Sequence, residues 1–367
     1  MILVKVQSDY YGGIDLHSKS MAVCIINAEG KVVLRKTIPN DFNDFLRITA
    51  SYKHSINFAV EATFNWYWLV DSCRAHGINI HLAHAYNLRL IHGTKNKSDK
   101  LDAYKIACLL RGGLLPFAYA CSPEKRTIRD MLRHRHSLVV QRSTLLAQTK
   151  ISFYQHGHVD LSSQSLRRLK HRQNAIEGFT DENIRMTTSI NMELATHYDN
   201  CIRALEKKVL EHTEEHYVDD LNLLLNVPGI GPIIGLTILY EIDTLSRFKT
   251  RQRFSSYCRL ARPLHTSNGK VVGGGNSKCG NAALKWAFME ILTNASVKSK
   301  QIKAVYLHLK QKYPNLKARA ILANHFATAI YYMLKHKKTF DINLFLKAFP
   351  GVVSQTPAPG GQVASAA

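Results

Sequence analysis

The sequence predicts an α/β domain at the N-terminus, a helical middle and a mainly α-helical C-terminal domain. Residues 10–39 alternate short apolar runs with turn residues, which indicates three strands joined by tight turns. Strand-like and helix-like segments then alternate, as expected for a mixed sheet flanked by helices. From about residue 122 apolar residues recur every three or four positions, which is typical of helices. At 367 residues the chain is long enough for two or three cores.

The first domain, residues 1–118, is expected to contain eight elements. Gly77 is a natural helix end, and Ser98 is a suitable N-cap for the last helix. The expected elements in order are three strands within 10–39, a helix at 41–52, a strand at 56–63, a helix at 65–77, a strand at 78–85 and a helix at 98–110.

The middle region, residues 119–220, is predicted to form long helices paired as a coiled-coil-like hairpin. Its tip or a loop is expected near 155–190. The C-terminal domain, residues 221–350, opens on "LNLLLNVPGIGPIIGLTILYEI", which resembles a helix–hairpin–helix. Its glycines allow a tight turn whose N–H groups could approach a phosphate, although a buried turn without ligand is the alternative. A basic, glycine-rich loop at 263–281, two amphipathic helices and a disordered tail at 351–367 complete the prediction.

The chain has a formal charge of +22, and this charge is unevenly distributed. Residues 89–150 hold 13 Lys and Arg against 4 Asp and Glu, and residues 244–320 hold 16 against 1. Clusters of this kind neutralise phosphates, which supplies most of the non-specific affinity for nucleic acids. We therefore expect a nucleic-acid partner. The expected contact residues are Lys95, Lys97, Lys100, Gly229, Gly231, Arg259, Arg262, Lys270 and Lys278.

Cysteine usage and hydropathy limit the compartment. Seven scattered cysteines without a C-x-x-C pair indicate reduced thiols, and no Cys/His spacing typical of a zinc site is present. No signal peptide is evident. The most apolar stretch, residues 221–242, contains two prolines and three glycines, which argues against a membrane span. We expect a cytoplasmic protein that does not associate with membranes.

Four acidic residues lie either where burial of a carboxylate would cost free energy or close to another acid. Asp15 and Glu61 each end a predicted strand, in "GGIDLHSK" and "FAVEAT", and a buried carboxylate needs a partner or a metal. Asp99 and Asp102 share one face of a predicted helix start, in "KNKSDKLDAYK". Each acid alone could be a solvated or structurally paired group. Together they predict a site for two divalent cations about 4 Å apart, which could polarise a phosphodiester.

The segments "GIDLHSK", "VEAT" and "KNKSDKLDAYKIACLL" resemble the D, E and D-x-x-D motifs of the DEDD transposases. "RLARPLHTSNGK" is similar to the family's G-L-x-P-x4-S-G motif, and "SKCGNAALKWA" to the helix start that follows it. The resemblance covers about residues 10–335. It implies an N-terminal domain of the ribonuclease-H-like, RuvC-like fold, in which Asp15, Glu61, Asp99 and Asp102 hold Mg²⁺ or Mn²⁺.

The resemblance also implies that Ser267 is a nucleophile that forms a covalent bond to DNA. Here Arg259 replaces the first glycine of the motif, Arg262 its proline and Asn268 its last glycine, as in the invertase-like branch of the family. His265 is a candidate base, or the acidic site could come to the serine, including from another subunit. Further implied are donor and target DNA, strand exchange through a Holliday-like junction, a structured bridge RNA, and a homodimer or homotetramer assembled through the helical middle.

Two other functions are compatible with the residues themselves. A RuvC-like, structure-selective endonuclease would use metal-activated water and only the N-terminal acids, leaving the basic C-terminal domain as a DNA clamp. A non-catalytic nucleic-acid scaffold would use the acids structurally and would bind without divalent metal. The sequence is compatible with both transposition and inversion. If base pairing supplies the specificity, the target and donor sequences cannot be read from the protein.

Overall fold

The computed structural model describes residues 5–91, 99–157, 166–261, 264–267, 270–274 and 279–350. For 89–91, 100, 264–267 and 271–274 it describes the backbone alone. The chain separates into two compact units, Met1–Pro123 and Glu124–Ala367. The finer, fourfold division expected from the sequence stays a prediction.

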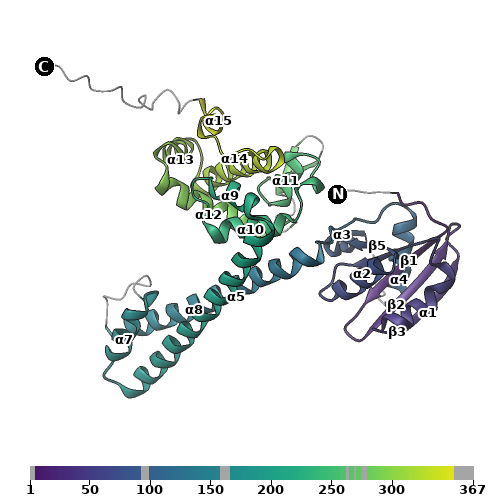
Figure 1. Ribbon diagram of the computed structural model, residues 1–367, viewed down its shortest axis with the longest axis horizontal. Helices are drawn as coiled ribbons and strands as arrows, with labels where there is room; N and C mark the ends of the chain where they lie inside the picture. The colour runs from purple at the N-terminus through teal and green to yellow at the C-terminus, as the bar shows by residue number, and fades with distance from the viewer. Residues whose placement is uncertain are drawn as a thin grey trace. The chain divides into compact units, whose positions relative to one another are not determined.

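The first unit is built on a five-stranded mixed sheet with the strand order β3-β2-β1-β4-β5 (Figure 1). Central strand β1 pairs antiparallel with β2 and parallel with β4, and β4 pairs parallel with β5. The elements are β1 (Tyr10–Leu16), β2 (Ser20–Asn27), β3 (Val32–Pro39), α1 (Phe42–Thr49), the 3₁₀ helix η1 (Ala50–Tyr52), β4 (Ile56–Glu61), α2 (Trp66–Ala75), β5 (Asn79–Ala83), α3 (Ala85–Ile91) and α4 (Asp99–Arg111). The predicted mixed sheet flanked by helices is therefore confirmed, and α3 is an addition to the prediction.

Helices cover both faces of this sheet because β1, β2 and β4 carry apolar side chains on both sides. Ile14 of β1 and Phe58 of β4 pack in the core that also contains residues of α1 and α2. Tyr11 and Ala59 lie on the opposite face of the same strands and pack with α4. Gly13 lets α4 come close to the sheet, because a Cβ at this position would lie 2.0 Å from the carbonyl oxygen of Ala103. The start of α4 is thereby held over β1.

The second unit is almost entirely helical. Its elements are α5 (Pro123–Gln155, whose first residue ends the first unit), α7 (Leu169–Glu177), α8 (Glu182–His216), α9 (Val218–Leu225), α10 (Pro232–Ile242), η2 (Leu245–Arg247), α11 (Arg251–Tyr257), β6 (Leu264–Ser267), β7 (Lys270–Gly274), α12 (Ala282–Lys298), α13 (Lys300–Lys312), α14 (Asn315–His336) and α15 (Ile342–Leu346). A predominantly helical C-terminal half is thus confirmed.

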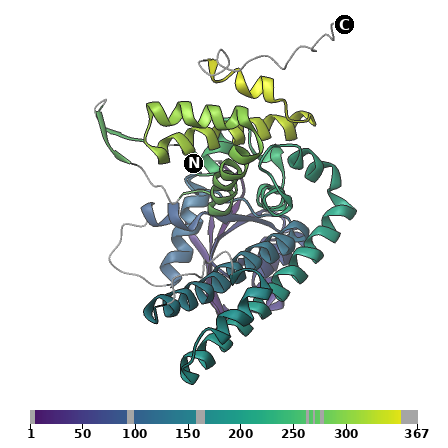
Figure 2. The same cartoon turned by 90° about the vertical axis from the view of Figure 1, so that its left-hand side faces the viewer.

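Two long helices, α5 and α8, lie side by side and run antiparallel (Figure 2). Arg135 Nε of α5 donates to Glu206 Oε1 of α8 over 2.8 Å, and Asn191 Nδ2 donates to Thr149 Oγ1 over 3.5 Å. Contacts that move forward along α5 therefore move backward along α8. Coiled-coil packing of this pair stays a prediction.

Two segments expected to be irregular have regular structure. The region 155–190, expected as a tip or loop, contains α7 and the start of α8, and Ala175 and Phe179 pack there in a small core with Met192. The expected basic loop at 263–281 contains the antiparallel pair β6–β7. The backbone hydrogen bonds of this pair do not require alternating apolar side chains. The sequence pattern therefore did not predict the two strands.

Helices α9 and α10 meet at a turn that contains both glycines of the predicted helix–hairpin–helix. Gly229 has φ +94°, and a Cβ there would lie 2.4 Å from Ile291 O, so this glycine is where α12 comes close. Gly231 is the N-cap of α10, and a Cβ there would have open space around it. The helix–hairpin–helix assignment stays a prediction.

Two expectations about the chain's chemistry can be compared with the structure. All seven cysteines are free thiols. Within the described part of the chain, none of the helices has the length and hydropathy of a membrane span.

Candidate active site

Asp15 and Glu61 lie at the ends of two neighbouring parallel strands. Ile14 of β1 is paired with Val60 of β4, so the two acids are the next residues along each strand. Side chains alternate between the faces of a strand, which places Asp15 on the same face as Gly13 and Glu61 on the same face as Ala59. That is the face covered by α4. Sheet register and the close approach of α4 therefore put both acids near the start of this helix.

His17 connects the sheet to the helix. Its Nε2 lies 3.1 Å from Asp15 Oδ2 and 3.4 Å from Asp99 Oδ1. One ligand atom from each of these three residues lies within 4.8 Å of the others. Asp15 is the most enclosed of them, with a side chain 13% exposed, whereas the side chain of Asp99 is 63% exposed. Asp15 is therefore the more buried carboxylate of the group and Asp99 the more accessible one.

Asp102 lies one helical turn after Asp99 and is the second acid of α4. Its Oδ1 accepts from Lys105 Nζ over 3.2 Å. Burial raises the pKa of Asp15 above its ordinary value, His17 partly opposes this, and the negative charges of Asp99 and Asp102 raise it further. Asp102 therefore belongs to the same electrostatic cluster as Asp15.

The backbone of His17 is held by two asparagine side chains. Asn65 Nδ2 donates to His17 O over 2.6 Å, and Asn40 Nδ2 donates to the same oxygen over 2.8 Å. Asn65 follows β4, so these bonds tie the β1–β2 turn to the strand end that carries Glu61. The site's shape therefore depends on neutral amides as well as on the acids.

His17 was missed as a site residue in the sequence prediction, although its spacing contained the signal. Residues two apart in an extended segment point to the same side, so an Asp-x-His pair at a strand end places an imidazole beside the carboxylate. The four acids alone match the carboxylate motifs, so those motifs do not single out this histidine.

The residues of this cluster fit a divalent cation. Carboxylate oxygens are the ligands that Mg²⁺ and Mn²⁺ prefer, and imidazole can add a nitrogen for Mn²⁺. Burial and the charges of Asp99 and Asp102 raise the pKa of Asp15, so its ionised form is disfavoured. A bound cation would favour the ionised form. The donor set and its electrostatics therefore agree with the metal that the carboxylate motifs imply.

The segment that carries Ser267 is closed at its base. Arg259 Nε donates to Gly280 O over 2.8 Å, and Asn281 N donates to Tyr257 O over 2.6 Å, so the two ends of the segment meet. Strands β6 and β7 stand away from the helices of the same unit (Figure 2). In this pair Ser267 is the partner of Lys270, whose side chain is exposed.

Arg259 has a backbone conformation that explains the glycine expected at its position. Its φ is +56°, in the left-handed region that costs a side chain about 1 kcal/mol or more and costs glycine little. The hydrogen bond from its Nε to Gly280 O offsets this cost. The departure from the glycine motif is therefore accommodated without opening the base of the segment.

The other predicted nucleic-acid contacts are placed only in part. Lys95, Lys97, Arg262 and Lys278 lie outside the described residues. For Lys100, in α4, only the backbone is described. The assignment of all nine predicted contact residues stays a prediction.

A buried carboxylate supports the base of the Ser267 segment. Glu241 of α10 is 4% exposed and accepts two hydrogen bonds from Arg133, over 2.7 and 2.8 Å. Its Oε2 also accepts from Asn281 Nδ2 over 2.6 Å, and that amide is 3.3 Å from the hydroxyl of Tyr257. Glu241 thus links α5 to both ends of the segment.

We expect Arg133→Met to destabilise the second unit by about 3 kcal/mol, because it leaves a buried carboxylate without its cation. Lys207→Met is the control, since Lys207 pairs with Glu211 on the surface of α8 with 80% of its side chain exposed. Such a pair contributes less than about 1 kcal/mol. Chemical denaturation followed by circular dichroism measures both values. Equal losses in the two variants would contradict a structural role for the Glu241 network.

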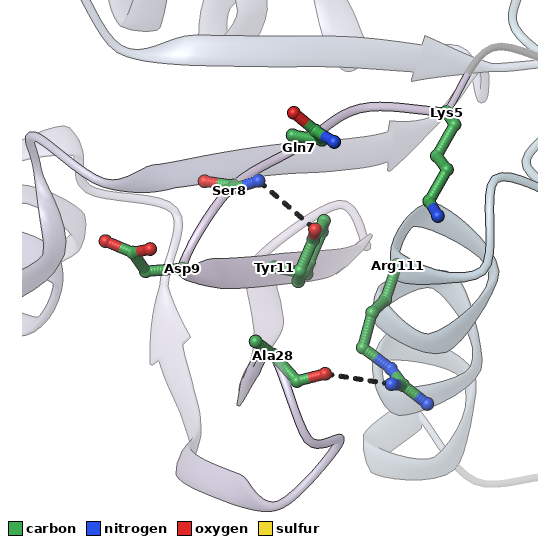
Figure 3. Close-up of a pocket in the computed structure, with 7 residues that line it drawn as sticks. All are labelled: Lys5, Gln7, Ser8, Asp9, Tyr11, Ala28 and Arg111. Carbon is green, nitrogen blue, oxygen red and sulfur yellow. Dashed lines mark hydrogen bonds between the residues drawn. The ribbon is translucent and has the colours of Figure 1, made fainter.

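A pocket of about 570 Å³ lies elsewhere in the first unit and is not this site (Figure 3). It is lined by residues near the beginning of β1 and the end of α4, including Lys5 and Arg111, whereas Asp15 is near the other end of β1. Within it Ser8 N donates to Tyr11 Oη over 3.1 Å and Arg111 Nη1 donates to Ala28 O over 2.9 Å. Open volume is therefore a poor guide to the chemistry of this unit.

A mixed sheet with carboxylates at adjacent strand ends and on the covering helix is consistent with the class of enzymes that have a ribonuclease-H-like sheet. The DEDD transposase model of the IS110 type matches residues 12–152, which include the four acids. The model described as transposase, IS116/IS110/IS902 family, matches residues 221–307, which include Ser267. The chain belongs to this family of insertion-sequence transposases and is an enzyme that cleaves and joins DNA.

Two similar proteins carry the same description. The chain is 21% identical over 352 residues to the transposase for insertion sequence element IS1111A of Coxiella burnetii, covering 89% of this chain and 90% of that protein. It is 27% identical over 150 residues to the mini-circle transposase for IS117 of Streptomyces coelicolor, covering 39% of this chain and 33% of that protein.

Proposed function

We propose that this transposase breaks and rejoins DNA strands through a serine nucleophile assisted by a divalent cation. The hydroxyl of Ser267 attacks the scissile phosphodiester, and the new bond joins its oxygen to phosphorus while a deoxyribose hydroxyl leaves. The cation is Mg²⁺ or Mn²⁺, held by Asp15, Glu61, Asp99 and Asp102.

The observation that carries this proposal is the cluster formed by Asp15, His17 and Asp99, with Glu61 beside it in the sheet. A divalent cation bound there would supply positive charge to the phosphodiester oxygens and lower the pKa of the attacking hydroxyl. The protein's own part is to hold the carboxylates in place through β1, β4 and α4. His17 orients Asp15 and Asp99 toward each other through its Nε2.

The serine distinguishes strand transfer from hydrolysis. A phosphodiester to Ser267 keeps the energy of the broken bond, so a DNA hydroxyl can later displace the serine oxygen. Exposed Lys270, paired with Ser267 across β6–β7, and Arg259 at the base of the segment provide positive charge for the phosphate backbone.

Target choice and assembly belong to the same proposal. A structured guide RNA pairs with donor and target DNA, and two or four copies of the chain act together. Residues 244–320 contain 16 Lys and Arg against 1 acid, which supports a nucleic-acid partner with an extended phosphate backbone. The acids lie in the first unit and Ser267 in the second, and the proposed chemistry uses residues of both, from one chain or from two.

The test is a trapping reaction on a suicide DNA substrate, with protein purified together with its bound RNA. We expect a denaturation-resistant, protease-sensitive DNA–protein adduct that requires Mg²⁺ or Mn²⁺ and disappears after chelation. Ribonuclease treatment before the reaction should remove adduct formation on specific DNA. The control is the same protein treated with heat-inactivated ribonuclease.

Two other outcomes would contradict the serine chemistry, and a third would contradict only the guide RNA. Free DNA ends without adduct would indicate a structure-selective endonuclease that uses water. DNA binding without any metal-dependent cleavage would indicate a scaffold. Adduct formation that persists after ribonuclease treatment would remove the guide RNA while leaving the serine chemistry in place.

A further inference from the structure

A second group of metal-ligating side chains lies in the helical unit. His212 and His216 are one turn apart near the end of α8, and Glu124 lies in the first turn of α5. One ligand atom from each lies within 4.8 Å of the others, and the two imidazole rings stack with centroids 4.6 Å apart. A histidine pair at this helical spacing with a carboxylate from another helix is a ligand set that zinc-type ions accept.

Hydrogen bonding determines which nitrogen of His216 can act as a ligand. Its Nδ1 lies 2.9 Å from the carbonyl oxygen of His212. A carbonyl only accepts, so Nδ1 carries the hydrogen and Nε2 carries the lone pair. Metal-binding histidines are commonly held in this way by a backbone carbonyl.

A chain of buried hydroxyls gives the same result for His212. Thr213 Oγ1 donates to Val209 O over 2.7 Å, so it must accept in its 2.8 Å contact with the hydroxyl of Tyr240. The Tyr240 hydroxyl therefore uses its hydrogen on Thr213 and accepts from His212 Nδ1 over 2.9 Å. Nε2 of His212 is left with the lone pair. Thr213 and Tyr240 are both fully buried, which holds this arrangement in place.

The carboxylate of Glu124 is also oriented. Tyr217 Oη donates to Glu124 Oε1 over 2.9 Å. The neighbouring Lys125 is directed to other partners, because its Nζ donates to Asp243 O over 2.6 Å and lies 4.2 Å from the centre of the Tyr217 ring. Each of the three possible ligands thus has a partner that fixes its orientation.

The charge around this group is unusual for the chain. The overall charge is +22, yet residues 211–220 contain five acids and no Lys or Arg. Two of these acids have cationic partners from outside the segment, because Glu211 pairs with Lys207 and Asp220 with Lys337. The group therefore rests on two oriented imidazoles and an oriented carboxylate rather than on the charge around it.

We propose that Glu124, His212 and His216 bind a divalent transition-metal ion of the zinc class, with water completing the coordination. The ion would connect the start of α5 to the end of α8, and through Tyr240 to α10. It would therefore stabilise the base of the long helical hairpin. This site is separate from the carboxylate cluster of the first unit and does not depend on the proposed DNA chemistry.

The test uses the full chain stripped of metal, with Co²⁺ as a spectroscopic probe and Zn²⁺ as a competitor. The Asp15→Asn variant serves as the background protein, so that the carboxylate cluster contributes less. We expect one equivalent of Co²⁺ to produce visible d–d absorption that Zn²⁺ removes. His216→Ala and Glu124→Gln should each weaken binding at least tenfold, and Tyr217→Phe, which removes the bond to the carboxylate, by about tenfold.

The matched control is His197→Ala, an exposed histidine on the same helix whose Nε2 is 3.5 Å from Cys201 Sγ. This variant should keep the Co²⁺ spectrum and the affinity. Circular dichroism confirms that His216→Ala and Glu124→Gln remain folded. Unchanged binding in both variants, or loss of the spectrum in His197→Ala alone, would overturn the assignment.

Discussion

Asp15→Asn is expected to reduce DNA cleavage by about 1,000-fold or more while leaving nucleic-acid binding close to wild type. Single groups that stabilise developing charge contribute two to three orders of magnitude to rate. Asp15 is the most enclosed carboxylate of its cluster, and Asn keeps its shape while removing its charge. The control is Asp9→Asn, an exposed acid just before the same strand. Cleavage of labelled DNA and a parallel binding assay measure the two effects.

The same substitution should stabilise the metal-free protein at neutral pH. Burial and the charges of Asp99 and Asp102 raise the pKa of Asp15 above 3.8, so its ionised form is disfavoured in the folded state. The carboxylate therefore costs stability as pH rises through this raised pKa, and the cost disappears when the pH falls below the ordinary value. Asp15→Asn should unfold at a higher temperature at pH 7 and should gain less than wild type from Mg²⁺ or Mn²⁺. Wild-type cleavage in this variant, or equal stabilisation of both proteins by metal, would contradict the metal assignment.

The acid positions could be predicted from the sequence because each follows a short apolar strand or opens a helix. A strand can be predicted from local alternation alone. Asp15 and Glu61 then lie at the same end of the sheet if β1 and β4 pair in parallel. The close approach of α4 was not predictable from that pattern. It depends on Gly13 facing Ala103, a contact between residues far apart in the chain.

Other features depend on contacts that leave no periodic signal. Glu241 is an acid within an apolar helix, which indicates that it has a partner elsewhere in the chain. That partner, Arg133, is 108 residues away in the sequence, so the pattern does not identify it. The β6–β7 pair consists of glycine-rich, basic sequence that does not alternate. The histidines at 212 and 216 lacked a recognisable zinc spacing because their third candidate ligand, Glu124, comes from another helix.

Ser267→Ala is expected to abolish the DNA–protein adduct and strand rejoining, because alanine has no oxygen to form the covalent bond. The expected effect is complete within detection, which is larger than the effect of removing one charge. The fold should be unaffected, since the base of the segment is closed by Arg259, Gly280, Asn281 and Tyr257 without the serine. Binding of DNA and RNA should stay close to wild type.

Two nearby hydroxyls provide the controls for this assignment. Thr266→Ala removes the adjacent hydroxyl of β6 and should keep the adduct. Tyr257→Phe removes a phenol that is 3.3 Å from the Asn281 amide, and whose ring lies 4.3 Å from the Arg247 guanidinium. That phenol is engaged within the protein, so we expect the adduct to survive its removal.

Mass spectrometry of the digested adduct locates the attachment, and only a peptide containing Ser267 agrees with the proposal. Because Ser267 and the acids lie in different units, mixing Ser267→Ala with Asp15→Asn adds a second measurement. If acids and serine come from different chains, the mixture should regain part of the adduct, since some active sites combine an intact serine with intact acids. If they come from one chain, each protein stays inactive. An adduct formed by Ser267→Ala alone would show that another residue, or water, performs the attack.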